Sequence, residues 1–151
     1  MIHGLEQTGL RSISGCYETA PVGPVAQRDF LNLVAGVETA LEHWAFLGAL
    51  KEIENRAGRT PSARWGPRTI DIDIILFGSL VLTTEELTIP HKEFRHRAFV
   101  LAPLAEIAAG VFDPETGKAV SQLLAELPGG QDVRLTGIRF DMAGLDEGRG
   151  G

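Results

Sequence analysis

The chain has 151 residues, of which 44% are hydrophobic and 23% are charged, and this composition is typical of one globular domain with a single core. The net charge of −6 argues against nucleic acid as the main partner, and no apolar run is long enough to span a bilayer. A single cysteine, Cys16, excludes an intrachain disulfide and a cysteine metal site, and the first residues lack a secretory pattern. We therefore expect a cytoplasmic protein with one domain over residues 1–143 and a disordered tail over 144–151.

The first half of the chain predicts two strands and one helix. Small and β-prone residues predict a strand at 12–19, which a proline-rich loop at 20–24 ends. Apolar and polar residues alternate from 29 to 39 and predict a second strand. Apolar residues spaced by three or four predict an amphipathic helix at 45–57, and Gly58 is a suitable residue to end it.

The second half of the chain mixes strands and helices. Isoleucine alternates with aspartate in a predicted strand at 69–77, and Gly78-Ser79 predicts a hairpin turn into 80–83. The later elements are an irregular segment at 85–90, a helix after His96, a helix at 120–127 and an edge strand at 133–142. Strands and helices interleaved in this way predict the α+β class with a mostly antiparallel sheet.

Asp71 and Asp73 are the main candidate functional residues. Their alternation with isoleucine puts both carboxylates on one face of the predicted strand and Ile70, Ile72 and Ile74 on the other. Side chains on one face lie about 6.8 Å apart along a strand, so one or two small cations can bind between the carboxylates. Magnesium takes one or two such carboxylates together with phosphate oxygens. The simpler interpretation is a pair of solvated carboxylates that interact with nearby arginines.

Basic residues precede and follow the two aspartates. Residues 59–68 form a loop rich in arginine, proline and glycine that includes Arg68. A mobile loop that carries Arg59 and Arg64 and ends in Trp65 can deliver positive charge to a phosphoryl group. His91 and the basic run 95–97 form a second group. Each group also has a structural interpretation, because charged loops are usually solvated and a single histidine is more often structural than catalytic.

Phe30 and Asn32 share one face of the predicted strand at 29–39. An aromatic ring beside an amide suggests the floor of a binding site for a flat ligand. A half-exposed strand with one chance asparagine explains the same pattern.

The run Arg-Trp-Gly-Pro-Arg-Thr-Ile-Asp-Ile-Asp at 64–73 is highly specific. The segments that accompany it in order and spacing are 17–23, 29–32, 88–91 and 97–104. Together they resemble the 6-hydroxymethyl-7,8-dihydropterin pyrophosphokinase family of folate synthesis, over residues 12–127. The resemblance implies a ferredoxin-like α+β sandwich and transfer of the β,γ-diphosphate of ATP to the pterin hydroxymethyl group, with release of AMP.

The resemblance also implies roles for the residues around ATP, which would be a co-substrate. Asp71 and Asp73 would bind two magnesium ions. Arg59 and Arg68 would neutralise charge on the transferred group, and Trp65 would help to seal the closed site. The further residues implied to contact ATP are Ile74, Thr88, His91 and Arg97.

A second set of residues is implied to bind the pterin. Phe30 and Phe99 would stack on its two faces, while the residues implied to read its edge are Thr19, Asn32 and the backbone of Val22. Glu54 aligns with a glutamate that is frequent in the family, without an assigned role.

The chain departs from the family pattern at its start. Family members open with a strand, a Gly-Ser-Asn turn and a helix, whereas residues 2–7 align with the end of that helix, so the first strand of the sheet is missing. Two explanations are open: a true start upstream of Met1, or a genuinely shortened chain. Lys92 stands where the family often has an aromatic residue, and Glu86 stands where an arginine can occur. Both departures would alter the contacts around ATP.

Three functions remain open from the sequence. The first is an active pyrophosphokinase whose partners are ATP and a dihydropterin, acting as a monomer without nucleic acid or membrane. The second is an inactive remnant that binds a pterin or a nucleotide. The third is a metal-dependent phosphohydrolase or nuclease with the same two carboxylates, and the negative net charge argues against its nuclease form.

Overall fold

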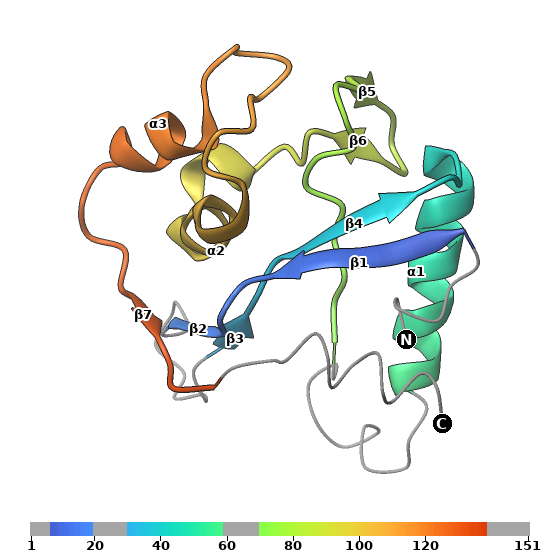
Figure 1. Cartoon of the computed structure of the whole chain (residues 1–151), viewed down its shortest axis with the longest axis horizontal. Helices are drawn as coiled ribbons and strands as arrows, with labels where there is room; N and C mark the ends of the chain where they lie inside the picture. The colour runs from blue at the N-terminus through green and yellow to red at the C-terminus, as the bar shows by residue number, and fades with distance from the viewer. Residues whose placement is uncertain (1–6, 20–29, 59–69, 139–151) are drawn as a thin grey trace.

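The computed structural model describes residues 7–19, 30–58 and 70–138, with short antiparallel strands and three α-helices in this part of the chain (Figure 1). In chain order the elements are β1 (Thr8–Ile13), β2 (Tyr17–Thr19), β3 (Phe30–Asn32), β4 (Ala35–Thr39), α1 (His43–Gly58), β5 (Leu82–Thr83), β6 (Thr88–Ile89), the 3-10 helix η3 (Phe94–His96), α2 (Ala98–Ala108), α3 (Val120–Ala125) and β7 (Val133–Leu135). The described strands form three ladders, β1–β4, β3–β2–β7 and β5–β6, and every pairing is antiparallel. The predicted α+β class is therefore confirmed.

Strands β1 to β4 form one bent antiparallel ribbon. β1 pairs with β4 and β2 with β3, and the bend lies where Ser14 meets Val34. The Ser14 N–H donates to Val34 O (2.8 Å), but the Val34 N–H donates to the Ser14 side-chain Oγ (2.9 Å). A side-chain oxygen thus replaces a backbone carbonyl and interrupts the ladder. For this reason the predictions of one unbroken strand at 12–19 and another at 29–39 were wrong.

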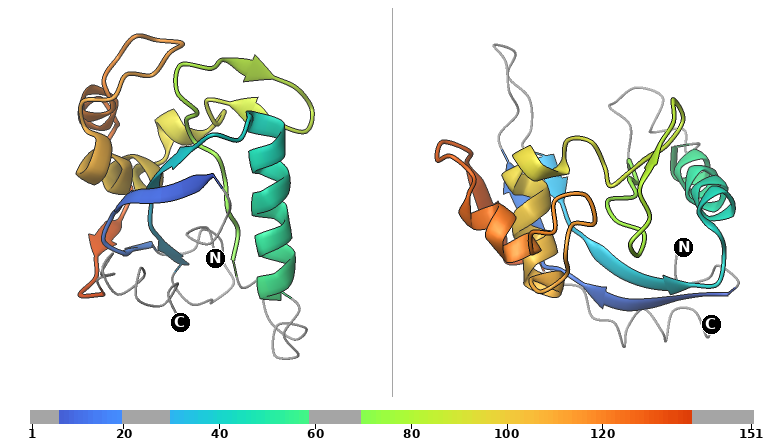
Figure 2. Two further views of the ribbon diagram at one scale, coloured as in Figure 1. Left: turned by 45° about the vertical axis from the view of Figure 1, so that its right-hand side comes forward. Right: turned by 90° about the horizontal axis from the view of Figure 1, so that it is seen from above.

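The two halves of the ribbon lie differently relative to the helices. The β1–β4 ladder spans the distance between α1 and the α2–α3 pair, as Figure 2 shows. The β3–β2–β7 ladder lies below α2 in Figure 1, and α2 contacts all three of its strands. The ribbon therefore connects two parts of the molecule that have separate hydrophobic cores.

Two clusters of buried side chains form these cores. The first core consists of Phe46, Leu50, Ile53, Ile74, Leu87 and Ile89. The second core consists of Phe94, Leu101, Leu104, Val120 and Leu123. Residues 70–76, which we call the aspartate segment, pass between the two: Ile72 packs against the first core, and Ile75 and Leu76 pack against the second.

The aspartate segment forms no strand ladder among the described residues, so the strand predicted at 69–77 was wrong over 70–77. Packing against α1 and a backbone hydrogen bond from His91 N to Ile75 O (2.9 Å) take the place of a neighbouring strand. Gly78-Ser79 forms a turn, because Gly78 has a φ of 56° and the Leu80 N–H donates to Phe77 O (3.0 Å), but the hairpin predicted there was wrong. The strand after this turn pairs forward with β6 and not back with the aspartate segment.

The predicted helices are confirmed with changes at their ends. Helix α1 begins at His43, two residues before the predicted start, because the Glu42 carboxylate accepts hydrogen bonds from Trp44 N (3.1 Å) and Ala45 N (2.7 Å). Helix α3 ends at Ala125, two residues before the predicted end. None of the helices among the described residues is long and apolar enough to cross a bilayer.

Several other predictions are only partly tested. The segment 85–90, expected to be irregular, contains β6, which pairs with β5. The edge strand predicted at 133–142 is confirmed as β7 for its first three residues. Residues 2–6 and the predicted tail at 144–151 lie outside the described residues.

We expect Ser14→Ala to lower the free energy of unfolding by about 1–3 kcal/mol, because the Val34 N–H at the bend loses its acceptor. Urea denaturation followed by circular dichroism measures this change. Ser12→Ala in the same ribbon is the matched control, because the described residues include no hydrogen-bond partner for the Ser12 side chain. An equal loss in both variants would contradict the role of the Ser14 hydroxyl.

Candidate functional site

Asp71 and Asp73 face outward from the aspartate segment. Both are exposed, whereas Ile72 is half-buried and Ile74 is 8% exposed in the first core. The predicted separation is confirmed for Ile72 and Ile74, which are more buried than the carboxylates, but it was wrong for Ile70, which is exposed. Burial of the isoleucines holds the backbone in place and leaves the carboxylates at the surface.

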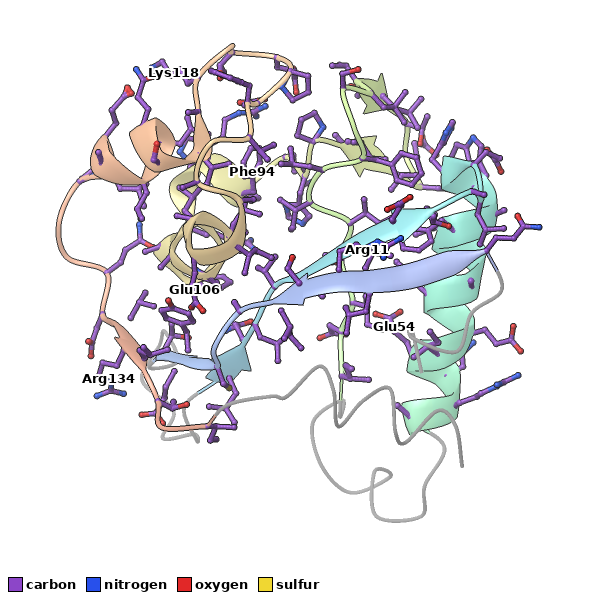
Figure 3. All side chains as sticks on the ribbon, viewed as in Figure 1. Arg11, Glu54, Phe94, Glu106, Lys118 and Arg134 are labelled. Atoms are coloured by element: carbon purple, nitrogen blue, oxygen red, sulfur yellow. The ribbon has the colours of Figure 1, made fainter. Side chains whose placement is uncertain are left out.

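Glu54 of α1 fixes the peptide between the two aspartates. Its Oε2 accepts a hydrogen bond of 2.6 Å from the Ile72 N–H (Glu54 is labelled in Figure 3). The bond joins a helix to an extended segment 18 residues later and adds a polar anchor to the apolar contacts. This contact gives a physical role to Glu54, to which the sequence assigned none.

The two carboxylates fit a magnesium site that is completed by a ligand. Among the described residues, no group of three or more His, Cys, Asp or Glu side chains could hold a metal ion. Magnesium is commonly bound by one or two carboxylates and keeps water and substrate phosphate as its other ligands. Asp71 and Asp73 supply two exposed carboxylates of this kind on a supported segment.

Three of the residues implied to contact ATP, Ile74, Thr88 and His91, lie in or close to the aspartate segment. The His91 N–H donates to Ile75 O (2.9 Å), and Ile74 shares the first core with Ile89, the neighbour of Thr88 in β6. The His91 Nδ1 accepts a hydrogen bond from the Glu93 N–H (3.2 Å). A neutral imidazole with Nδ1 as the acceptor carries its proton on Nε2, which can then donate to an anionic oxygen.

An ion pair inside the protein anchors the turn between His91 and Arg97. The Arg95 guanidinium donates to both carboxylate oxygens of Asp113, at 2.5 Å and 2.9 Å, and Asp113 is fully buried. The side-chain hydrogen bond from Arg95 lowers the pKa of Asp113 to about 2, against the opposing effect of burial. Phe94, which has no exposed surface, anchors the same turn in the second core.

The candidate pterin residues lie on the β3–β2–β7 ladder and at the start of α2. Thr19 pairs with Phe30 and Tyr17 pairs with Asn32, so the Thr19, Tyr17 and Asn32 side chains share one face of the ladder. The α2 helix covers this face. Tyr17 lies on it, and its hydroxyl donates to Oε1 of Glu106 in α2 (2.8 Å).

Phe99 links the two groups of candidate residues. It lies in the first turn of α2, and the Arg97 guanidinium carbon is 5.5 Å from the centre of its ring. A residue implied to bind phosphate and a residue implied to bind pterin are thus in contact.

Four of the candidate residues lie outside the described part of the chain: Val22, Arg59, Trp65 and Arg68. The backbone of Phe30 is described but its side chain is not. The loop implied to carry charge to the transferred group therefore stays a prediction.

Sequence reasoning missed three residues that hold the site together: Asp113, Glu106 and Gln131. A turn signal at Asp113 is visible in the run Asp-Pro-Glu-Thr-Gly, where the Glu115 N–H donates to Asp113 Oδ1 (3.0 Å). The sequence contains no signal for the other bonds, because they join residues 33 to 91 positions apart.

Comparisons with known proteins identify one family. A family model described as 7,8-dihydro-6-hydroxymethylpterin-pyrophosphokinase (HPPK) matches residues 1–109. The 2-amino-4-hydroxy-6-hydroxymethyldihydropteridine pyrophosphokinase of Haemophilus influenzae is 42% identical over 126 residues, which cover 83% of this chain and 76% of that protein. The protein of the same name from Pseudomonas aeruginosa is 42% identical over 133 residues, covering 88% and 82%. That from Bacillus subtilis is 41% identical over 122 residues, covering 81% and 73%.

We expect Glu54→Ala to weaken metal binding about tenfold, because the peptide between Asp71 and Asp73 loses its anchor. The measurement is the affinity for Mn²⁺, as a paramagnetic substitute for Mg²⁺, in the presence of α,β-methylene-ATP. Glu54→Gln is the matched control, because its amide oxygen can still accept the Ile72 N–H. Unchanged affinity in Glu54→Ala would contradict this role.

The Arg95–Asp113 pair predicts a loss of stability in acid. Because the pKa of Asp113 is lowered from 3.8 to about 2, the ionised carboxylate stabilises the folded state fully above pH 4, and this stability is lost as the pH falls through 2. The contribution is about 2 kcal/mol. Between pH 5 and pH 2 the unfolding free energy of the wild type should therefore fall more steeply than that of Asp113→Asn. Parallel curves would contradict the assignment.

Proposed function

We propose that this chain, which belongs to the 7,8-dihydro-6-hydroxymethylpterin-pyrophosphokinase family, is an ATP-dependent diphosphotransferase of folate biosynthesis. It transfers the diphosphate of ATP to 6-hydroxymethyl-7,8-dihydropterin and releases AMP. The observation that carries this proposal is the bond of 2.9 Å from His91 N to Ile75 O, because it joins a candidate phosphate ligand to the segment with the two outward carboxylates. Identities of 41–42% with proteins named as this enzyme favour an active chain over an inactive remnant.

The reaction is a displacement at the β-phosphorus of ATP. The pterin hydroxymethyl oxygen forms a bond to this phosphorus, and the bond from the β-phosphorus to the oxygen that bridges it to the α-phosphorus breaks. AMP leaves with that electron pair, and the hydroxyl proton is released. Such a transfer depends mainly on positioning and on stabilisation of negative charge.

In this proposal Asp71 and Asp73 would hold two magnesium ions. Bound magnesium would neutralise phosphate charge and orient the phosphate chain. The outward direction of both side chains and the Glu54 anchor between them support this role.

His91 and Arg97 bind the ATP phosphates in this proposal. The Nε2 proton of His91 can donate to a phosphate oxygen, while its Nδ1 is occupied by the Glu93 N–H. Ile74 and Thr88 lie by the adenine. Arg59 and Arg68 supply positive charge to the transferred group, and Trp65 seals the site; these three roles rest on the family motif.

Phe30 and Phe99 stack on the pterin ring, and the residues that read its edge are Thr19, Asn32 and the Val22 backbone. The pairing of Thr19 with Phe30 and the cover of that face by α2 support this arrangement. The same proposal assigns the reaction to a monomer with one domain over residues 1–143 in the cytoplasm, where ATP is available, and without nucleic acid as a partner.

The direct test is AMP release from ATP and magnesium, with and without 6-hydroxymethyl-7,8-dihydropterin. AMP that forms only with the pterin supports the transferase. Phosphate release without the pterin would instead indicate the phosphohydrolase alternative, and a folded chain that releases neither product would contradict the proposal.

We expect Asp73→Ala to abolish pterin-dependent AMP release, because the substitution removes a metal ligand. Glu126→Ala, at an exposed carboxylate beside α3, is the matched control and should keep wild-type turnover. Turnover is measured by chromatographic separation of AMP and ATP. Wild-type AMP production by Asp73→Ala would show that the metal assignment is wrong.

A further inference from the structure

Arg97 occupies an unusual position at the start of a helix. It is the N-cap residue of α2, with extended angles of φ −116° and ψ 109° between the 3-10 helix η3 and α2. An N-cap residue usually accepts a hydrogen bond from the first turn through its side chain, which arginine cannot do, and a cation near a helix N-terminus is disfavoured. Arg97 accordingly makes no side-chain cap.

The backbone of Arg97 is fully used by the two helical segments beside it. Its N–H donates to Phe94 O (3.4 Å), and its carbonyl accepts from Val100 N (3.0 Å) and Leu101 N (2.9 Å). The adjoining groups are the carbonyl of His96, at the end of one helical segment, and the N–H of Ala98, at the start of the next. Both groups need partners from elsewhere, because no helical bond satisfies them.

Gln131 supplies both partners. Its Oε1 accepts from Ala98 N (2.8 Å), and its Nε2 donates to His96 O (2.9 Å). These partners define which end of the amide is oxygen, because a backbone N–H can only donate and a carbonyl can only accept. One side chain, 34 residues after Arg97, thus binds the peptide groups on both sides of it.

Two bonds to the flanking peptide groups restrict the backbone angles of Arg97. These angles set the direction of its Cα–Cβ bond and therefore the region that the guanidinium can reach. Gln131 thus supplies the cap of α2 that the Arg97 side chain cannot provide. Its guanidinium lies over the Phe99 ring, at the junction of the candidate phosphate and pterin residues.

We propose that Gln131 is a positioning residue for Arg97 in the binding of the ATP phosphates. This inference rests on the proposed function, because Arg97 acts there on ATP. Gln131 lies after the segment that the family model matches, which ends at residue 109. The bonds are solvent-exposed, so a moderate effect is expected.

The test is a double-mutant cycle read by calorimetric binding of magnesium and α,β-methylene-ATP. We expect Gln131→Ala to raise the Kd about three- to tenfold in the wild-type background. In an Arg97→Ala background the same change should have no further effect, because Gln131 acts through Arg97. Asp132→Ala, an exposed neighbour in the same connection, is the control and should bind as the wild type does.

A merely structural cap gives a different result. It would lower binding by the same factor whether or not Arg97 is present, and this additivity would overturn the proposal, as would an unchanged Kd in Gln131→Ala. Gln131→Glu provides a second variant if the alanine variant is unstable, because it keeps the acceptor for Ala98 N and removes the donor to His96 O. It should also raise the Kd, and this rise should also disappear without Arg97.

Failure of the proposed function is distinguishable from failure of this inference. A wild-type chain that binds the analogue but makes no pterin-dependent AMP would contradict the transferase, while the cycle would still decide the role of Gln131. A wild-type chain that does not bind the analogue would overturn both.

Discussion

Burial of the isoleucines in the aspartate segment is the constraint on which the rest of the site depends. Ile74 lies in the first core, Ile72 packs against it, and Ile75 packs against the second core. Full burial of such a side chain contributes about 1.5–3 kcal/mol. Apolar contacts on both sides therefore fix a segment that has no strand ladder among the described residues. Because Asp71 and Asp73 alternate with the isoleucines in the sequence, their carboxylates remain exposed.

The bent ribbon relates the two candidate binding regions to each other. Its β1–β4 half runs from the bend towards α1, the helix that carries Glu54 (Figure 1). Its β2–β3 half carries Thr19 and Asn32 below α2. The bend is a local event, in which the Ser14 side chain takes the place of a backbone acceptor. At the far end of α2, Glu106 accepts hydrogen bonds from Gly15 N, at 3.2 and 3.1 Å, and fastens the bend to the helix (Figure 3).

Sequence reasoning succeeded where a short pattern determines the outcome. The spacing of Phe46, Leu50 and Ile53 predicted α1, which is confirmed. The alternation around Asp71 and Asp73 predicted that both are exposed beside more buried isoleucines, which is confirmed for Ile72 and Ile74 but not for Ile70. The family was recognisable from one specific run, and its match confirms the ferredoxin-like α+β class. Strand partners were harder, because β5 could pair back with the aspartate segment or forward with β6 on the sequence pattern alone.

The bonds that orient the site could not be predicted, because they join side chains to distant backbone groups. Such a bond leaves no periodic signal in either segment, and the two bonds of Gln131 to His96 and Ala98 are the clearest example. Residues such as Arg59 and Arg68 are known from the motif alone and lie outside the described residues.

The side-chain-to-backbone bonds also have a consequence for sequence variation. Glu54, Glu106 and Gln131 accept hydrogen bonds from backbone N–H groups. These bonds do not depend on which side chain is present at the donor positions, which are Ile72, Gly15 and Ala98. Relatives can replace those residues within the limits of packing and still keep the bond. Proline is the exception at all three positions, since it removes the N–H that each bond requires. The sequence around the site can therefore diverge while its geometry is kept by Glu54, Glu106 and Gln131, whose side chains accept hydrogen bonds from the backbone.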